Sequence, residues 1–244
     1  MAKHADSVAM TALRIAGHVL RERIRPHMAK CAGDVPSSVA VLTPEWWTAV
    51  MCAAHPDARV LSFDVMGESA GTHQRHRFLL SYNEAGHIAR LPMAVFTKTL
   101  PNVLTRMIGG YNGTARAEGR FYQEIRPALA IEAPQGYHTA FDRDTLAGIN
   151  VLEDIVTSRG ARFCDAGTYV TRDMAESMVD LLAQLHAHAY DSARLTQQWR
   201  WLANFADWFE VGARKMGTEQ YTRKALLRMK ERVPARFVKR IDEV

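Results

Sequence analysis

Cysteine is scarce in this sequence, which has three such residues, Cys31, Cys52 and Cys164. They stand far apart, form no C-x-x-C pair and are odd in number. This pattern supports neither a disulfide framework nor a zinc knuckle as the basis of the fold. Free thiols fit a reducing compartment, so we expect a cytoplasmic protein.

Long apolar runs are also missing. Arg14 and then the charged residues within 21–25 interrupt the N-terminal apolar residues before these reach the length of a signal peptide or membrane span. We therefore expect no export signal and no membrane-spanning segment. The sequence has no internal repeat and no low-complexity stretch, so it does not indicate a solenoid.

The composition that is present is typical of a globular protein with one large domain or two lobes. Of its 244 residues, 48% are hydrophobic and 23% are charged. The 31 basic residues outnumber the 26 acidic ones, which gives a formal net charge of +5. This charge favours anionic ligands such as nucleotides, nucleic acid or acidic membrane surfaces, and it selects none of them by itself.

The residue pattern places strands between helical segments. Helical spacing of apolar residues predicts helices over 7–25, 43–55, 116–129, 171–189, 195–215 and 222–232. Runs typical of strands, separated by turn residues at 66–72 and 83–86, occupy 60–65, 75–82, 91–99, 137–141 and 148–152. The predicted fold class is α+β, with a five-stranded antiparallel sheet followed by helices.

Five segments carry a family resemblance. They are AVFTKTLP (94–101), AEGRFYQEIRPAL (117–129), APQGY (133–137), INVLEDI (149–155) and MVDLLAQLHAHAY (178–190). In this order and spacing they resemble the aminoglycoside phosphotransferase and ecdysteroid kinase-like group, which has a protein-kinase-like fold. The resemblance covers about residues 40–190. It implies N-terminal helices and a nucleotide-binding N-lobe over 1–153, and a partial helical C-lobe over 154–244.

The resemblance also implies an activity and its ligands. Members of this group are ATP-dependent phosphotransferases that act on a hydroxyl group of a small molecule, with ATP and Mg²⁺ as cofactors. The expected partners are therefore a nucleotide and a small-molecule hydroxyl acceptor. The sequence does not name the acceptor.

Lys98 is the residue that the resemblance places against the nucleotide phosphates. Its neighbours Val95 and Phe96 are expected to anchor the sheet. Without this pattern, a lysine in a strand is more often a solvated edge residue. Glu118 is the expected ion-pair partner that holds Lys98 in its working rotamer, and Glu124 is the competing candidate.

Gly67, Ser69 and Gly71 lie where the resemblance expects a loop over the phosphates. Glycine permits close approach of the backbone, and free N–H groups in such a loop bind anionic oxygens. The segment departs from G-x-G-x-x-G because it has two glycines only. A simple hairpin turn is the alternative interpretation.

Leu152, Glu153 and Asp154 match the hinge of the family, a strand end whose backbone groups contact the adenine edge while apolar side chains enclose the ring. The alternative is a buried strand end followed by an acid that caps a helix. Both interpretations can hold together.

The catalytic loop of kinase-fold phosphotransferases, written H-G-D or H-R-D with an Asn five residues after the Asp, has no match. The H-x-D at residues 4–6 precedes the nucleotide lobe and has Thr11 in the place of that Asn. We expect no catalytic residue and no metal ligand in this chain, with the Mg²⁺ ligands supplied from outside it. We interpret it as truncated before the catalytic loop, through fragmentation or a split gene, and expect self-association or a missing C-terminal half.

Two rival functions stay open. A non-catalytic nucleotide-binding or scaffold protein would bind nucleotide without turnover. Nucleic-acid binding is suggested by ten basic against four acidic residues within 214–243. These charges spread around helices, so a solvated helical surface is the commoner explanation and nucleic acid is the less favoured partner.

Overall fold

The computed structural model describes residues 8–165, 167–190, 193–206, 208–209, 217–229 and 231–240. The chain divides into two compact units, one of residues 12–192 and one of residues 1–11 together with 193–244. Across the described ranges, no helix combines the length and the apolar character needed to cross a membrane.

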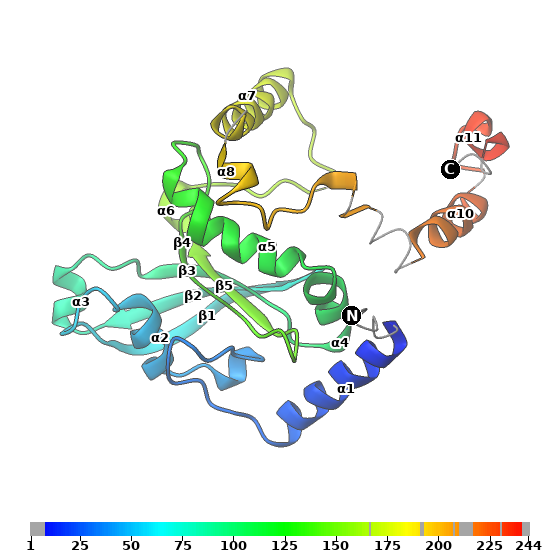
Figure 1. Ribbon diagram of the computed structural model, residues 1–244. Coiled ribbons are helices and arrows are strands. Elements are labelled where there is room, and N and C mark those ends of the chain that lie inside the picture. The colour runs from blue at the N-terminus through cyan, green and yellow to red at the C-terminus, as the bar shows by residue number, and fades with distance from the viewer. Residues whose placement is uncertain are drawn as a thin grey trace. The chain divides into compact units, whose positions relative to one another are not determined.

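A five-stranded sheet organises the larger unit (Figure 1). The strands are β1 (Val60–Ala70), β2 (Gln74–Tyr82), β3 (Ala94–Thr99), β4 (Gly136–Phe141) and β5 (Gly148–Glu153). They lie in the order β1-β2-β3-β5-β4, and every neighbouring pair is antiparallel. The prediction of an α+β fold with a five-stranded antiparallel sheet is therefore confirmed.

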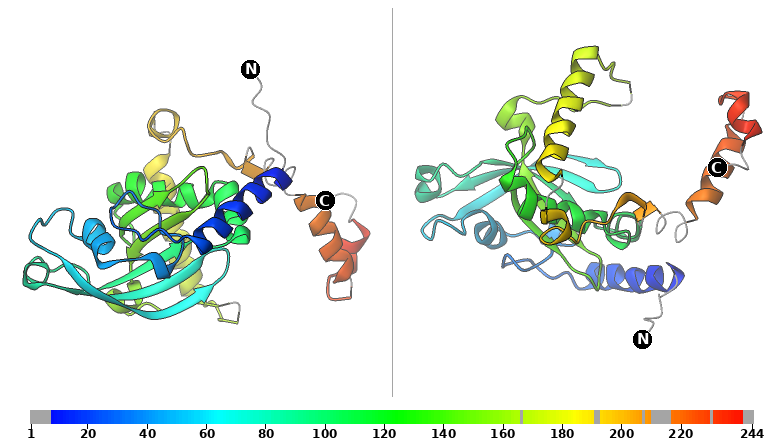
Figure 2. Two further views of the ribbon diagram at one scale, coloured as in Figure 1. Left: turned by 90° about the horizontal axis from the view of Figure 1, so that it is seen from below. Right: turned by 45° about the horizontal axis from the view of Figure 1, so that its top comes forward.

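Helical segments precede, separate and follow the strands along the chain. Before and within the sheet they are α1 (Val8–Ile24), η1 (Val39–Val41), α2 (Pro44–Met51), α3 (Glu84–Ile88), α4 (Val103–Thr105), η2 (Arg106–Tyr111), α5 (Thr114–Arg120), η3 (Phe121–Ile125) and η4 (Arg126–Ala128). After β5 come α6 (Ile155–Arg159), α7 (Arg172–Ala189), α8 (Ala193–Thr196), α10 (Thr218–Arg228) and α11 (Ala235–Lys239). Figure 2 shows the twisted β1–β2 hairpin in cyan from two further sides.

The main core lies on the face of the sheet that packs against α2. Trp46 and Trp47 are fully buried there with Phe78 and Val95. Helix α2 begins as its sequence predicts, because the Thr43 side chain accepts a hydrogen bond from the Trp46 N–H at 3.1 Å and a proline follows the cap. The opposite face of the sheet is thereby left for α5.

A buried arginine fastens α1 to this unit. Arg106 is fully buried, and its guanidinium donates to Glu22 of α1 at 2.5 and 3.0 Å. It also donates to the carbonyl oxygens of Leu100 and Thr145 at 3.0 and 3.2 Å. A buried charge of this kind is tolerated because it is paired and its donors are satisfied.

The first part of the predicted phosphate loop is wrong. Gly67 and Ser69 belong to β1, where they pair with Arg77 and Arg75 of β2, so that only residues 71–73 form the turn. Cross-strand pairing satisfies backbone groups that a loop would leave open, which explains why β1 continues through the glycine.

Three further boundaries differ from the prediction. Strand β3 begins at Ala94 because Pro92, which lacks an N–H, cannot donate to the ladder. Residues 84–86 of the predicted turn at 83–86 belong instead to α3 (Glu84–Ile88), whose first turn is capped by the Asn83 side chain. The continuous helix predicted over 195–215 is wrong, because α8 ends at Thr196 and residues 197–204 are not helical, although residues 205–206 and 208–209 are helical. Residues 207 and 210–216 of that prediction lie outside the described residues.

Candidate functional site

Two cross-strand rows of side chains mark the face of the sheet opposite α2. Strand register places Ser69, Arg75, Lys98 and Asn150 side by side across β1, β2, β3 and β5. The next row on this face holds Gly67, Arg77, Phe96 and Leu152. Because side chains alternate along a strand, the two rows share one face and lie two residues apart. A polar row thus stands beside a largely apolar one.

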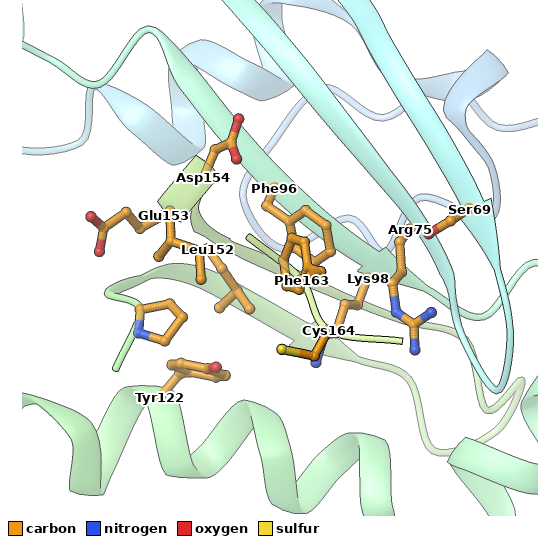
Figure 3. Close-up of a pocket in the computed structure, with 12 residues that line it drawn as sticks. Ser69, Arg75, Phe96, Lys98, Tyr122, Leu152, Glu153, Asp154, Phe163 and Cys164 are labelled. Atoms are coloured by element: carbon orange, nitrogen blue, oxygen red, sulfur yellow. The ribbon is translucent and has the colours of Figure 1, made fainter. Parts of the chain in front are cut away.

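A cavity of about 620 Å³ opens over these rows (Figure 3). Its lining comprises Ser69, Arg75, Phe96, Lys98, Tyr122, Pro134, Leu152, Glu153, Asp154, Ile155, Phe163 and Cys164. Its size falls within the roughly 300–1,000 Å³ of small-molecule sites. One end is cationic and the other carries rings and aliphatic groups, so the cavity suits a ligand with an anionic end and a flat apolar end.

Lys98 and Glu118 meet as the sequence predicts. The Lys98 ammonium donates to Glu118 Oε1 at 2.5 Å, and each side chain is about one quarter exposed, at 25% and 24%. Glu124, the competing candidate, instead accepts two hydrogen bonds from Arg120 on its own helix, at 2.6 and 2.8 Å. The choice of Glu118 over Glu124 is therefore confirmed as geometry.

Gly119 explains why α5 brings Glu118 so close to the sheet. A Cβ atom at this position would lie 2.2 Å from Thr139 Oγ1 and 3.1 Å from Asn150 Oδ1. Real Cβ atoms do not approach other atoms so closely, so only glycine fits between the helix and these two strands. The neighbouring Glu118 is thereby held at the level of the polar row.

The helix that carries Glu118 does not continue as predicted over 116–129. It ends at Arg120 and passes into a π-helical turn, Phe121–Ile125, and then a 3₁₀ turn at Pro127. Within the π-helical turn, Tyr122 lines the cavity and packs against Gly136, where a Cβ atom would lie 2.6 Å from the Tyr122 Cβ. Burial, together with Glu118, raises the pKa of Tyr122 to about 12, so its hydroxyl stays neutral.

Asp154 closes the other end of the cavity and is almost fully buried. Its carboxylate accepts hydrogen bonds from Arg77 at 2.8 and 3.0 Å, from the Thr157 hydroxyl at 2.8 Å and from the Val156 N–H at 3.2 Å. Burial alone would raise the pKa of Asp154, but the hydrogen bonds from Arg77 and Thr157 outweigh it and lower the pKa. The expectation of a helix-capping acid is confirmed.

Glu153 is likewise occupied by the protein itself. Arg159 donates to it at 2.6 and 2.9 Å, and the Ser158 hydroxyl donates at 2.6 Å. The hydrogen bond from Arg159 lowers the pKa of Glu153 to about 2. The carboxylates of Glu153 and Asp154 are therefore not available to a ligand. The Glu153 N–H and the Asp154 carbonyl oxygen are also occupied, by Gln135 at 2.8 Å and by the Ser158 N–H at 2.9 Å.

Several lining residues were missed from the sequence. Phe96 was expected to anchor the sheet with Val95, yet Val95 alone is buried in the core and Phe96 lies on the cavity face. Strict alternation along β3 could have revealed this. Phe163, whose ring centroid lies 6.2 Å from that of Phe96, comes from a segment without pattern, and no sequence signal points to it.

The H-x-D tripeptides bring no catalytic group to the cavity. Residues 4–6 lie outside the described residues. A second such tripeptide, His55-Pro56-Asp57, was overlooked in the sequence. It forms an exposed turn after α2, where the Asp57 carbonyl oxygen accepts a hydrogen bond from Asn83 at 2.8 Å. Five residues after Asp57 stands Ser62, which also departs from the catalytic-loop pattern.

Comparison with protein-family models, with curated proteins and with solved structures gave no match to this chain.

Proposed function

We propose that the cavity binds ATP, and that this chain forms the nucleotide-binding part of a phosphotransferase that acts on a small-molecule hydroxyl. The observation that carries the proposal is the Lys98–Glu118 ion pair, in which the lysine lies on β3 and lines the cavity while the glutamate lies on α5. This is the arrangement with which kinases hold the phosphates of ATP. Glu118 would fix the lysine rotamer while the ammonium group contacts phosphate oxygens.

The apolar end of the cavity supports a purine as the ring. Phe96 and Leu152 stand directly opposite each other in the sheet, and Phe163 and Pro134 add further apolar surface. Beside them, Ile155 is the first residue of α6, and no carbonyl of that helix accepts its N–H. A backbone donor beside a flat apolar slot is what an adenine edge requires.

The carboxylates that line the cavity, Asp154 and Glu153, are paired with Arg77 and Arg159 and are therefore not free to hold Mg²⁺. Among the described residues, no three His, Cys, Asp or Glu side chains come together as a metal site. We therefore derive no step through the ion. The pairing of both lining carboxylates with arginines also fits the second candidate function, nucleotide binding without turnover, in which the chain acts as a scaffold.

The test is ATP binding by the full chain, measured by isothermal titration calorimetry. Lys98→Ala should weaken ATP binding at least tenfold, because a charge-assisted hydrogen bond to phosphate contributes about 1.5–3 kcal/mol. Lys30→Ala, which removes an exposed lysine elsewhere in the same unit, is the matched control and should bind as the parent does. Equal ATP affinities of the two variants would refute the phosphate role of Lys98.

A second measurement separates the candidate functions. ATP consumption is followed with a panel of small alcohols at several Mg²⁺ concentrations. Binding without consumption would favour the non-catalytic function, and Mg²⁺-dependent phosphorylation would favour the phosphotransferase. NMR shifts confined to the basic helices α10 and α11, induced by oligonucleotides and not by ATP, would favour nucleic-acid binding.

A further inference from the structure

Arg75 stands directly opposite Lys98 in the β2–β3 ladder, and both line the cavity. Figure 3 shows the two side chains reaching into the same part of the cavity from neighbouring strands. Side chains directly opposite on antiparallel strands have Cβ atoms about 4.5–5.5 Å apart. The cationic end of the cavity is therefore built from two basic residues.

The carboxylates around the cavity are each matched by one cation. Glu118 pairs with Lys98 at 2.5 Å, Asp154 with Arg77 at 2.8 Å, and Glu153 with Arg159 at 2.6 Å. The Arg75 guanidinium takes part in no ion pair or hydrogen bond with any residue that the structure describes, whereas its backbone pairs with both neighbouring strands. Its guanidinium is thus the surplus positive charge of the site.

The hairpin turn shapes the space around this guanidinium. A Cβ atom at Gly71 would lie 3.2 Å from Arg75 Nη1, so the glycine leaves room for the arginine to lie against the turn. Next to it, burial lowers the pKa of His73, and Lys98 and Arg75 lower it further against the opposing effect of Glu118. The imidazole is thereby kept neutral, which avoids a third positive charge at this end.

Two cations placed directly opposite in a sheet repel each other, and such pairs are destabilising without an anion between them. Glu118 neutralises one of the two. A ligand with more than one negative charge would offset the other, and a planar guanidinium can bind two oxygens of a phosphate at once.

We infer that Arg75, together with Lys98, binds the phosphate chain of the ligand, so that the site selects polyphosphates over nucleosides and monophosphates. The inference rests on the proposed function for the identity of the nucleoside, but not for the anionic end. Arg75 is not among the residues implied by the family resemblance. It would therefore be an additional determinant of ligand choice in this chain.

The test measures dissociation constants of the full chain for ATP, ADP, AMP, adenosine and inorganic tripolyphosphate. For the parent chain, affinity should fall from ATP to AMP by at least tenfold. Arg75→Gln should remove most of this difference and leave adenosine binding unchanged, and Arg75→Lys should restore part of it. Arg143→Gln, in the exposed β4–β5 turn, is the control and should behave as the parent does.

A second readout does not depend on the ligand. Because Arg75→Gln removes the repulsion with Lys98, the midpoint of thermal unfolding of the unliganded chain should rise, and added tripolyphosphate should raise that midpoint less than it does for the parent. A fall in the unliganded midpoint, with no change in the response to tripolyphosphate, would show that Arg75 has only a packing role.

The outcomes separate this inference from the proposed function. ATP binding that is equal in the parent and in Arg75→Gln would overturn the inference and leave the proposed function standing. Binding of tripolyphosphate that depends on Arg75, without any contribution from adenosine, would support the inference and refute the nucleotide as ligand. Equal affinities of the parent for ATP and adenosine would overturn the inference.

Discussion

At the scale of single residues, the proposed role of the Lys98–Glu118 ion pair is to position a ligand rather than to stabilise the fold. Both side chains are partly exposed, and such pairs stabilise the folded state by less than about 1 kcal/mol. The value of the pair lies in holding the ammonium group at one place on the cavity wall, because a lysine side chain alone adopts many rotamers.

Glu118→Gln tests this directly. We expect ATP affinity to fall roughly threefold to tenfold, since the lysine keeps its charge but loses its fixed position, while unfolding free energy changes by less than about 1 kcal/mol. Glu124→Gln is the control on the same helical segment, because it breaks a pair with Arg120 that has no contact with Lys98. Calorimetric titration and urea unfolding measure the two quantities. An equal loss of affinity in both variants would contradict the positioning role.

At the scale of elements, the contact of α5 with the sheet depends on one residue without a side chain. Gly119 lies against Thr139 and Asn150, and the preceding residue, Glu118, forms the ion pair with Lys98. The missing side chain of Gly119 thus sets both the distance of the helix from the sheet and the position of the candidate phosphate contact.

Gly119→Ala should destabilise the protein by about 1–3 kcal/mol, because the added methyl group forces the helix away from β4 and β5. It should also weaken ATP binding, since Glu118 moves with the helix. Gly17→Ala in α1 is the matched control: nothing lies within 4 Å of its added Cβ, and alanine should stabilise that helix by about 0.5–1 kcal/mol. Urea unfolding monitored by circular dichroism gives both values, and a stabilised Gly119→Ala would refute the close contact.

The sequence predicted the parts of this site that local chemistry determines. The helical spacing of apolar residues over 43–55 and the residue pattern of the strands are local signals, and α2 and the five strands followed from them. Lys98 and Glu118 were predicted from motif order rather than from spacing. The role of Gly119 depends on the distance between two elements distant in sequence, and the surplus charge of Arg75 depends on which carboxylates other basic residues neutralise. Neither is written in a short stretch of sequence.

At the scale of the whole molecule, one buried and two partly buried histidines link stability to pH. Burial lowers the pKa of His73, His76 and His138 below the usual 6.5; Glu68 opposes this at His76, and a hydrogen bond with the Ala32 backbone opposes it at His138. The unfolded chain therefore binds more protons than the folded chain once the pH falls below about 6.5. The stability contributed by these groups is complete above that pH and is lost as the pH decreases through the lowered values.

We expect the free energy of unfolding to decrease between pH 7.5 and pH 5, with about 1.4 kcal/mol for each unit by which a pKa is lowered. Replacing His76 and His138 together by Phe should flatten this dependence. Replacing exposed His55 by Asn should leave it as it is. Urea unfolding across this pH range is the measurement, and an unchanged slope in the double variant would exclude these two histidines as its cause.

Helix α7 leaves apolar side chains open to solvent. Met174, Met178, Val179 and Leu182 are all exposed on it. Apolar surface of this extent on one helix favours association. This exposed apolar surface is consistent with the expected self-association or missing C-terminal half, and both stay predictions.

Self-association should therefore increase with concentration in analytical ultracentrifugation, and a hydrophobic dye should bind. Met178→Lys together with Leu182→Lys should reduce both self-association and dye binding. Ser177→Lys is the control: it adds a charge to the same helix without removing an apolar group and should reduce neither. A monomer that binds no dye at any concentration would contradict this expectation.

The pairing of β2 has one more consequence. Arg75 and Arg77 stand two positions apart on this strand, one beside Lys98 and the other bonded to Asp154 at the opposite end of the cavity. A strand advances about 3.3 Å per residue and resists stretching along its length. The strand therefore fixes the spacing, along the cavity, of the two arginines that carry the guanidinium groups. This spacing limits the length of a molecule that fits, and the backbone keeps it constant whatever conformation the surrounding loops adopt.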